Sequence, residues 1–392
     1  MVSSSQSQAG PADPAAPATL AALPAATPPS SDSDLAAMRE ALRLAALAIG
    51  LSDPNPRVGC VIIGRDGQLL GAGHTQPAGQ AHAEVMALRD AAARGADVRG
   101  ATAYVTLEPC AHHGRTPPCC DALIAAGIGR VVAALEDPNP LVAGQGLGRL
   151  RAAGIATELG LLADEARELN IGFLSRMQRG RPFVRLKIAA SLDGRTALLN
   201  GASQWITAAA ARADGHAWRK RAGAVLTGIG TVRDDDPRLD VRLVETARQP
   251  LRVVIDSRLE TPAGARLLAP PGEVLIYGAV DPAGRPDLQA AGAQLLQFAG
   301  PQGKVDLSAV LDDLGRRGIN ELHVEAGHKL NGSFLREGLV DELLVYLAPK
   351  LLGQGREMAA FGPLDSLQDA LQWRWLDCQP VGEDLRLRAR PR

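Results

Sequence analysis

The sequence predicts an α/β protein built from two domains. Short apolar runs typical of strands alternate with amphipathic runs typical of helices along most of the 392 residues, and this alternation is the pattern of layered α/β structure. The alternation pauses at residues 176–182, a polar stretch that contains a glycine and a proline, and then starts again. Since domains usually hold about 100–200 residues, the length also favours two.

The first 33 residues are mostly Ala, Pro, Ser and Thr. They bury too little apolar surface to offset the entropy of ordering, so a disordered tail is predicted. The first domain is expected over residues 34–176, with a helix that begins after Ser33 or Asp34 and keeps one face apolar as far as Ile49. Strands are expected at 58–63, 69–72, 103–107, 131–135 and 154–158, and further helices at 82–93 and 119–126.

Residues 176–182 are the predicted linker, and the second domain is expected over residues 182–392. Its strands are expected at 183–189, 224–228, 251–255, 273–277, 321–324 and 342–347, and its helices near 208–221, 307–317 and 330–337. No internal repeat relates the two halves.

Composition narrows the class of protein. The formal net charge of -1 provides no basic excess that would attract a nucleic-acid backbone. No run of about 18 apolar residues occurs, so no membrane span is expected. The first basic residue is Arg39, which argues against a secretory signal or a basic transit peptide. Five cysteines, three of them within eleven residues, favour a cytosolic metal site over a disulfide framework, and we expect a cytoplasmic protein.

Three residues form a predicted zinc site. His82 opens a predicted helix, Cys110 follows a strand, and Cys119 opens another helix. One imidazole and two thiolates can hold Zn²⁺ and leave its fourth position for water, whose pKa the metal lowers to about 7. Glu84 lies two residues beyond His82 and is the predicted catalytic proton shuttle. H-x-E followed by P-C-x-x-C is the signature of zinc nucleobase deaminases.

The spacing of the two cysteines departs from that signature. Eight residues separate Cys110 from Cys119, which indicates a distinct branch of deaminases. The alternative is a closed zinc site that only stabilises the fold, with His112, His113 or Cys120 as the fourth ligand. Cys120 is otherwise interpreted as a buried helix residue. Cys60 and Cys378 lie in apolar, strand-like surroundings, and both are predicted to be core residues.

The motifs on both sides of the linker closely resemble the bifunctional deaminase–reductase family of riboflavin biosynthesis. In the first half they are PNPRVGCVI at 54–62, HAEV at 82–85, TLEPC at 106–110, PPC at 117–119 and DPNP at 137–140. In the second half they are LKIAASLDGRT at 186–196 and SQWIT at 203–207. The resemblance covers nearly everything from Leu35 onward.

The resemblance implies a cytidine-deaminase-like three-layer domain followed by a dihydrofolate-reductase-like α/β domain. The first would deaminate 2,5-diamino-6-ribosylamino-4(3H)-pyrimidinone 5′-phosphate. The second would use NADPH to reduce the ribosyl group of the product to ribityl. The expected partners are this small pyrimidine ribosyl phosphate and, because family members are often dimers or larger, other copies of the chain, with no nucleic acid and no membrane.

By the same resemblance, two sets of residues bind substrate and NADPH. The substrate set is Asn55, Ser203, Arg219, Leu239, Arg242 and Glu325. The NADPH set is Ala189, Trp205, Thr231, Asp235, Ser257, Gly327, His328, Lys329, Leu330, Asn331, Gly332 and Ser333. Physical reasoning supports parts of both sets, because arginine binds phosphate in bidentate fashion and a glycine before a helix N-terminus lets backbone N–H groups meet a phosphate. For Trp205 a plain core position is the alternative.

Two further segments needed interpretation. Lys187 stands in an otherwise apolar strand, and lysine is rarely buried without a partner. We expect it to be catalytic, aiding opening of the sugar ring or stabilising charge during hydride transfer, with Glu325 as its partner. Residues 144–148, GQGLG, look like a phosphate-binding loop, but the preceding strand is distant and an ordinary loop is predicted.

Three other functions were weighed against the bifunctional enzyme. A deaminase with a non-catalytic C-terminal module would release ammonia without oxidising NADPH. A nucleic-acid-editing deaminase is disfavoured by the neutral charge and by the lack of a basic or aromatic stripe. A non-enzymatic protein held together by zinc would need Glu84 for folding and not for chemistry.

Overall fold

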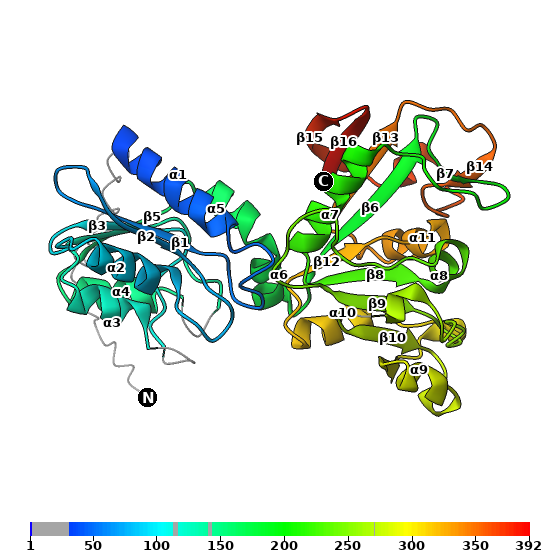
Figure 1. Ribbon diagram of the computed structural model, residues 1–392, viewed down its shortest axis with the longest axis horizontal. Coiled ribbons are helices and arrows are strands. Elements are labelled where there is room, and N and C mark those ends of the chain that lie inside the picture. Colours follow the sequence, from blue (N-terminus) through cyan, green and yellow to red (C-terminus); the bar gives the residue numbers. More distant parts are fainter. Residues whose placement is uncertain (2–30, 113–116, 140–142, 270) are drawn as a thin grey trace.

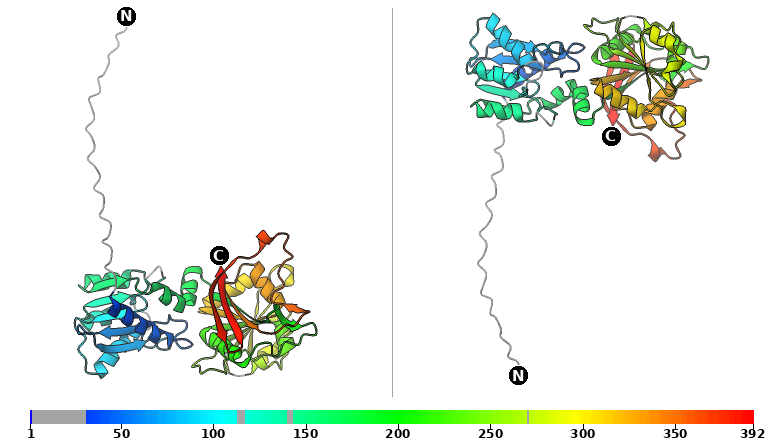
Figure 2. Two further views of the ribbon diagram at one scale, coloured as in Figure 1. Left: turned by 90° about the horizontal axis from the view of Figure 1, so that it is seen from above. Right: turned by 90° about the horizontal axis from the view of Figure 1, so that it is seen from below.

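The computed structural model describes Met1 and residues 31–112, 117–139, 143–269 and 271–392. Two α/β domains lie side by side, with the helices α5 (Ala163–Leu169) and α6 (Ile171–Arg179) between them (Figures 1 and 2). Because α6 continues to Arg179, most of the predicted linker at 176–182 is helical, and the connection proper begins at Gly180, whose φ of 71° ends the helix. The predicted tail lies almost wholly outside the described residues.

The first domain has three layers. Within the described residues its sheet has five strands in the order β2-β1-β3-β4-β5. The helix α1 covers one face, and α2, α3 and α4 cover the other (Figure 1). The bounds are α1 Asp32–Ala46, β1 Gly59–Ile63, β2 Leu69–His74, α2 Ala83–Ala93, β3 Thr102–Val105, α3 Cys119–Ala125, β4 Arg130–Ala133, α4 Gln145–Ala152 and β5 Ala156–Leu159.

Glycines allow the helices to approach this sheet closely. A Cβ on Gly59 would lie 1.9 Å from the backbone oxygen of Ala41 in α1. A Cβ on Gly71 would lie 2.2 Å from the backbone oxygen of Ala87 in α2, on the opposite face. Neither position has room for a side chain, so the short, glycine-containing strands let the helices pack directly on the backbone.

Two predictions for this domain were wrong in detail. Helix α1 begins at Asp32, two residues before the expected domain boundary, because Ser31 and Asp34 form a reciprocal capping box. Residues 145–148, predicted as loop, belong to α4, which begins after Gly144 with its φ of 73°. Gly146 and Gly148 have weak helix propensity, but the tertiary packing of Leu147 and Leu150 overrides it.

The second domain contains a larger sheet. Over the described ranges it has nine strands in the order β11-β10-β9-β8-β12-β6-β13-β16-β15, parallel from β11 to β13 and antiparallel at β16 and β15. The strands are β6 Phe183–Ser191, β8 Ala224–Gly228, β9 Leu251–Ile255, β10 Val274–Gly278, β11 Ala293–Gln297, β12 Glu321–Val324, β13 Glu342–Ala348, β15 Trp373–Val381 and β16 Asp384–Pro391, and a separate pair is β7 Arg195–Leu198 with β14 Gly355–Glu357. The helices are α7 Ala209–Arg221, α8 Ile229–Asp235, α9 Pro286–Ala290, α10 Leu307–Arg316 and α11 His328–Arg336.

The cysteines outside the zinc cluster divide into buried and exposed positions. Cys60 and Cys120 are fully buried, as predicted. Cys378 is exposed on β15, an edge strand, so the prediction that it is a core residue was wrong. The sequence around it reads as an apolar strand, but an edge strand at the end of a sheet buries little of either face.

No helix in the described part of the chain is long and apolar enough to cross a bilayer.

Candidate active sites

The predicted zinc ligands come together at the ends of two helices. His82 is the N-cap residue of α2 and Cys119 is the first residue of α3, while Cys110 lies in the loop after β3. His82 Nδ1 is 3.7 Å from Cys110 Sγ and 3.4 Å from Cys119 Sγ. All three donor atoms lie within 4.8 Å of one another, which is the separation expected around one tetrahedral ion.

The surroundings favour the thiolate form of Cys110, while the pKa of its neighbour Cys119 is raised, first by its hydrogen bond to Cys110 and then by burial. The backbone N–H of Cys119, at the N-terminus of α3, donates to Cys110 Sγ at 3.3 Å. A hydrogen bond from the Cys119 thiol, opposed by burial and supported by His82, lowers the pKa of Cys110 to about 4. Lowered thiol pKa values are typical of cysteines that ligate metal.

The described residues fit an open site better than a closed one. Three donors form the cluster found among them, and they leave a fourth position free. The Cys120 thiol donates toward Asp121 Oδ1 at 3.7 Å instead, and His112 is exposed. His113, the remaining alternative ligand, lies outside the described residues. An open position is what a catalytic zinc site requires.

Glu84 lies directly beside the cluster, on the first turn of α2. It is 3% exposed, and burial, followed by repulsion from Cys110, raises the pKa of its carboxyl group to about 7. A carboxyl group with a pKa near neutrality can both take and return a proton, which is the property a general acid–base catalyst needs.

One residue of this site was missed by the sequence reasoning. The buried carboxylate of Glu108 accepts three backbone N–H groups, from Asp137 at 3.1 Å, Gly144 at 3.0 Å and Leu147 at 3.0 Å. It therefore ties the loop before α4 to the chain just ahead of Cys110. A carboxylate between an apolar strand and Pro109-Cys110 was the available signal, since a buried charge requires donors.

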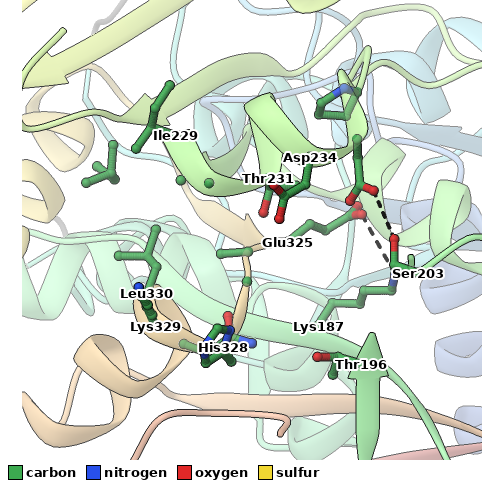
Figure 3. A pocket seen from close by; sticks show the side chains of 18 of the residues that line it. Lys187, Thr196, Ser203, Ile229, Thr231, Asp234, Glu325, His328, Lys329 and Leu330 are labelled. Atoms are coloured by element: carbon green, nitrogen blue, oxygen red, sulfur yellow. Dashed lines mark hydrogen bonds and ion pairs between the residues drawn. The ribbon is translucent and has the colours of Figure 1, made fainter. Parts of the chain in front are cut away.

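The second domain contains a cavity of about 1840 Å³. Every predicted reductase residue except Gly332 lines it, from Lys187 on β6 to Ser333 on α11, and Figure 3 shows several of them pointing into the same space. Pockets for one small ligand usually measure about 300–1,000 Å³, so this cavity has room for a dinucleotide and a substrate together.

Glu325 lies at the centre of the charged part of the cavity. It follows β12, and its carboxylate accepts hydrogen bonds from Arg219 Nε at 2.5 Å and Nη2 at 2.9 Å. Lys187 Nζ lies 3.8 Å from Oε2 of the same carboxylate, and Figure 3 shows the two residues facing each other, which confirms the predicted partner of Lys187. Burial lowers the pKa of Lys187, and Glu325 opposes that shift.

The N-terminus of α11 faces the cavity. Gly327 is its N-cap residue, and a Cβ at Gly327 would lie 3.6 Å from Thr231 Oγ1. Gly332 differs from its neighbours, because a Cβ there would lie 2.1 Å from the backbone oxygen of Ala360. Asn331 lines the cavity, but its amide donates to Met358 O at 2.8 Å. These two residues therefore also seat α11 on the segment after β14.

A cluster of cations stands at the mouth of the cavity. Arg238 and Arg242 both pair with Asp240, at 2.8 and 2.5 Å, and both guanidinium groups are more than 40% exposed. Leu239 between them in the chain is buried with a φ of 54°, and both arginines line the cavity. Arg242 binds Asp240 through Nη1 alone and is 43% exposed, so its other N–H groups can meet an anion, whereas Arg219 binds both oxygens of Glu325.

Two residues near this cluster, Asp240 and His216, were not predicted. His216 lines the cavity, and its Nδ1 accepts from the backbone N–H of Arg242 at 3.1 Å. Burial, followed by repulsion from Arg219, lowers its pKa to about 4, so it is neutral at pH 7. Its position three residues before Arg219 on one helix was the available signal.

Three further predicted residues that line the cavity are Ser203, Ser257 and Trp205. Ser203 Oγ donates to Asp235 Oδ1 at 2.9 Å, and Ser257 Oγ accepts from the backbone of Val305 at 3.3 Å. Trp205 is 60% exposed and stacks at 4.6 Å on the Arg212 guanidinium. The alternative that Trp205 is an ordinary core residue is therefore wrong.

Asn55 lies apart from this cavity. It borders a small hollow between the domains together with Arg57 and Asn320. Its place in substrate binding stays a prediction.

Comparison with known proteins decides the family. The model of the cytidine and deoxycytidylate deaminase zinc-binding region matches residues 31–135, and that of the RibD C-terminal domain matches residues 182–387, over half of the chain. The riboflavin biosynthesis protein RibD of Escherichia coli K12 is 47% identical over 362 residues, covering 89% of this chain and 96% of that protein. The chain belongs to the RibD family.

Solved structures agree with this assignment. Acinetobacter baumannii RibD, form 1, is 44% identical with a TM-score of 0.83, covering 92% of this chain and 99% of that one. The deaminase/reductase of Thermotoga maritima is 32% identical with a TM-score of 0.82 and the same coverage. The resemblance seen in the sequence and both predicted domain folds are therefore confirmed.

This RibD-family chain is a bifunctional enzyme of riboflavin biosynthesis, with a zinc-dependent deaminase domain followed by an NADPH-dependent reductase domain. The residues present fit both groups. One imidazole and two thiols in a tight cluster are a zinc donor set, and the cavity combines sufficient volume with a helix N-terminus and several cations.

Proposed function

We propose that each domain catalyses one of the two reactions, the first at the zinc-ligand cluster and the second in the large cavity. Residues 34–176 deaminate 2,5-diamino-6-ribosylamino-4(3H)-pyrimidinone 5′-phosphate, and residues 182–392 then reduce the ribosyl group of the product to ribityl. The observation that carries the proposal is the presence of a complete donor set for zinc beside a buried carboxyl group in one domain and of a large cation-lined cavity in the other.

In the deaminase domain His82, Cys110 and Cys119 hold zinc, which when bound supplies an activated water at neutral pH. Glu84 takes a proton from that water and delivers it to the departing amine. Its burial serves this role, because a desolvated carboxyl group with a pKa of about 7 passes a proton in either direction at little cost. Asn55 binds the pyrimidine or its ribosyl group.

In the reductase domain NADPH supplies the hydride, and the residues around Glu325 act on the sugar. Glu325 contacts the ribosyl hydroxyls, held in place by Arg219. Lys187 donates a proton or stabilises charge at the sugar oxygen as the ring opens. Arg242 and Ser203, which both line the cavity, bind the 5′-phosphate. Leu239, which lines the cavity near Arg242, contacts the substrate.

The NADPH phosphates are assigned to the N-terminus of α11, from Gly327 to Ser333, where backbone N–H groups and the helix dipole favour anions. Ala189, Trp205, Thr231, Asp235 and Ser257 complete the cofactor wall. Gly332 belongs to this set through the packing of α11 on Ala360 and not through a surface that faces the cavity.

Three further properties complete the proposal. The enzyme acts in the cytoplasm, because its thiol-rich zinc site suits a reducing compartment. It forms a homo-oligomer, and its substrate is a small molecule and not a nucleic acid, in keeping with a formal net charge of -1.

A coupled assay tests the division of labour. The purified chain is given the diaminopyrimidine ribosylamine phosphate and NADPH, and ammonia and NADPH absorbance are followed together. Ammonia release followed by equimolar NADPH oxidation is expected. Ammonia without NADPH oxidation would contradict the reductase assignment, and NADPH oxidation without ammonia would contradict the order of the two reactions.

A further inference from the structure

The loop that contains Asn55 is held in part by residues of the reductase domain. Asn320, which directly precedes β12 of the reductase domain, donates its side-chain amide to Asp53 Oδ1 at 3.0 Å and to Pro54 O at 3.1 Å. Its own side-chain oxygen accepts from Arg176 Nε at 2.7 Å. Asn320 is 3% exposed, and its bond to Asp53 is fully buried, whereas those to Pro54 and Arg176 are partly buried.

The other end of the loop is fixed in the same way. Arg57 is 3% exposed, and its Nη1 donates to Glu321 Oε1 at 2.6 Å while its Nη2 donates to Arg221 O at 2.7 Å. The reductase domain therefore contacts the loop on both sides of Asn55, at Asp53 and at Arg57. The chain from Asn320 can come this close because Gly172 of α6 has no side chain, and a Cβ there would lie 2.6 Å from Asn320 O.

Without Asn320 the buried carboxylate of Asp53 would lose a hydrogen bond, and Pro54 O would keep only its bond from Arg176 Nη2 at 3.0 Å. Asp53 is 7% exposed, and apart from Asn320 its side chain meets Arg248 at 3.4 Å and Arg57 at 3.9 Å. Buried polar groups that lose their partners draw the chain toward water. The deaminase domain itself supports Arg57 and Pro54 through Asn170 and Arg176, but the hydrogen bond to Asp53 Oδ1 comes from the reductase domain.

We propose that Asn320, although it belongs to the reductase domain, is a positioning residue for the deamination reaction, acting through Asp53 and Pro54 to place Asn55 against the substrate. The inference rests on the proposed role of Asn55. If Asn320 has this role, the deaminase site needs the fused reductase domain, because that domain supplies hydrogen bonds that hold the loop.

The test compares Asn320→Ala with Glu168→Gln in the full-length, zinc-loaded enzyme. Glu168 also bridges the domains, through Arg388 at 2.5 Å and Arg390 at 2.6 Å, but it does not touch the loop at 53–57. Asn320→Ala is expected to reduce deaminase kcat/KM by about ten- to a hundredfold, mainly through KM, since small misplacements of binding groups cost this much. Reductase turnover on the deaminated substrate and zinc content should stay at wild-type values, and Glu168→Gln should leave both reactions unchanged.

Equal losses in the two variants would overturn the proposal, because they would mean that general docking of the domains matters and the loop does not. A normal deaminase in Asn320→Ala would overturn it as well. Loss of reductase activity together with deaminase activity would point to misfolding, and then a second variant decides. Asn320→Asp places a second carboxyl group opposite Asp53, and Asp53→Asn in the same chain restores an amide–carboxylate pair at that contact, while Pro54 O keeps its bond from Arg176 Nη2. Recovery of deaminase kcat/KM in the double variant is expected, and no recovery overturns the proposal.

Asn55→Ala, measured in the same assay, separates the inference from the proposed function. A normal KM in Asn55→Ala would contradict the substrate-binding role of Asn55 and, with it, this inference. An impaired Asn55→Ala beside a normal Asn320→Ala would leave the proposed function in place and overturn only the role of Asn320. Hydrogen exchange of the backbone amides of Asn55 and Arg57 gives a readout free of substrate, and faster exchange is expected in Asn320→Ala but not in Glu168→Gln.

Discussion

Arg219 holds both carboxylate oxygens of Glu325, with Nε 2.5 Å from Oε1 and Nη2 2.9 Å from Oε2. The two residues come from different elements, Arg219 from the last turn of α7 and Glu325 from the segment after β12. Burial alone would raise the pKa of Glu325, but the Arg219 guanidinium and then the Lys187 ammonium outweigh it and hold that pKa well below its ordinary value. Glu325 is therefore a fixed anion in the reductase cavity.

Arg219→Lys should impair the reductase although it keeps the charge. Lysine cannot bind a carboxylate in bidentate fashion, so Glu325 would lose its fixed orientation. Reductase kcat/KM is expected to fall by about ten- to a hundredfold, with deaminase turnover unchanged. Arg43→Lys is the matched control, because Arg43 donates Nε and Nη2 to the two carboxylate oxygens of Glu40, both at 2.7 Å, on an exposed surface, where such a pair contributes little. Equal effects of the two substitutions would contradict this reading of Arg219.

Lys187→Ala should reduce reductase kcat by about a hundredfold or more if Lys187 moves a proton. Its pKa is lowered from 10.5, first by burial and also by Arg219, while Glu325 opposes the shift. The lysine therefore loses its proton at a lower pH than a free lysine, and reductase kcat/KM should decline as pH rises through that lowered value. Lys187→Arg stays charged to higher pH, so this alkaline decline should disappear from the profile. An unchanged profile in Lys187→Arg would mean that another group causes it.

The sequence predicted the zinc ligands but not their support. His82, Cys110 and Cys119 were found because metal ligands have few alternatives in type and spacing. Glu108 was not found, because its three hydrogen-bond donors come from a segment that begins 29 residues later, and no local pattern reports such a contact.

The larger elements were predicted by periodicity, but the strands β15 and β16 were not. Both carry arginine side chains, and β15 also carries tryptophans, whose partners come from distant parts of the chain and cannot be seen in the local sequence. Arg388, for example, is stabilised by Glu342 at 2.9 Å and Glu168 at 2.5 Å. Cys378 on β15 was placed in the core because a single strand does not show whether it lies inside a sheet or at its edge.

Glu84→Gln should abolish deamination while zinc remains bound. Glutamine fills the same volume but cannot carry the proton, so ammonia release is expected to fall by about a hundred- to ten-thousandfold. Zinc content by metal analysis and reductase turnover should match the wild type. Loss of the metal or of the fold in this variant would favour a structural role for Glu84.

Removal of zinc should separate the two activities. His82, Cys110 and Cys119 all belong to the first domain, and no cavity-lining residue of the second domain is among them. Dialysis against a chelator is expected to stop ammonia release and to leave NADPH oxidation on the deaminated substrate largely intact, with recovery of deamination on return of zinc. Loss of NADPH oxidation in the metal-free enzyme would show that the second site depends on the first.

Gly146→Ala should weaken zinc binding, although Gly146 does not touch the metal site. A Cβ at this position in α4 would lie 1.9 Å from the backbone oxygen of Pro109, so either α4 or the Pro109–Cys110 backbone must move. Overpacking of this kind usually destabilises a fold by about 1–3 kcal/mol, and the shift should displace the Cys110 ligand. We expect a lower Tm and faster loss of zinc to a competing chelator.

Gly148→Ala is the control for this prediction, since Gly148 lies in the same helix and a Cβ there meets nothing within 4 Å. Replacing a helical glycine with alanine at an open position should stabilise the protein by up to about 1 kcal/mol and leave zinc release unchanged. If both variants released zinc at the wild-type rate, α4 could not be the element that positions Cys110. If both released it faster, the cause would be helix composition and not the contact with Pro109. Faster release from Gly146→Ala alone is the result that the close approach of α4 to Pro109 requires.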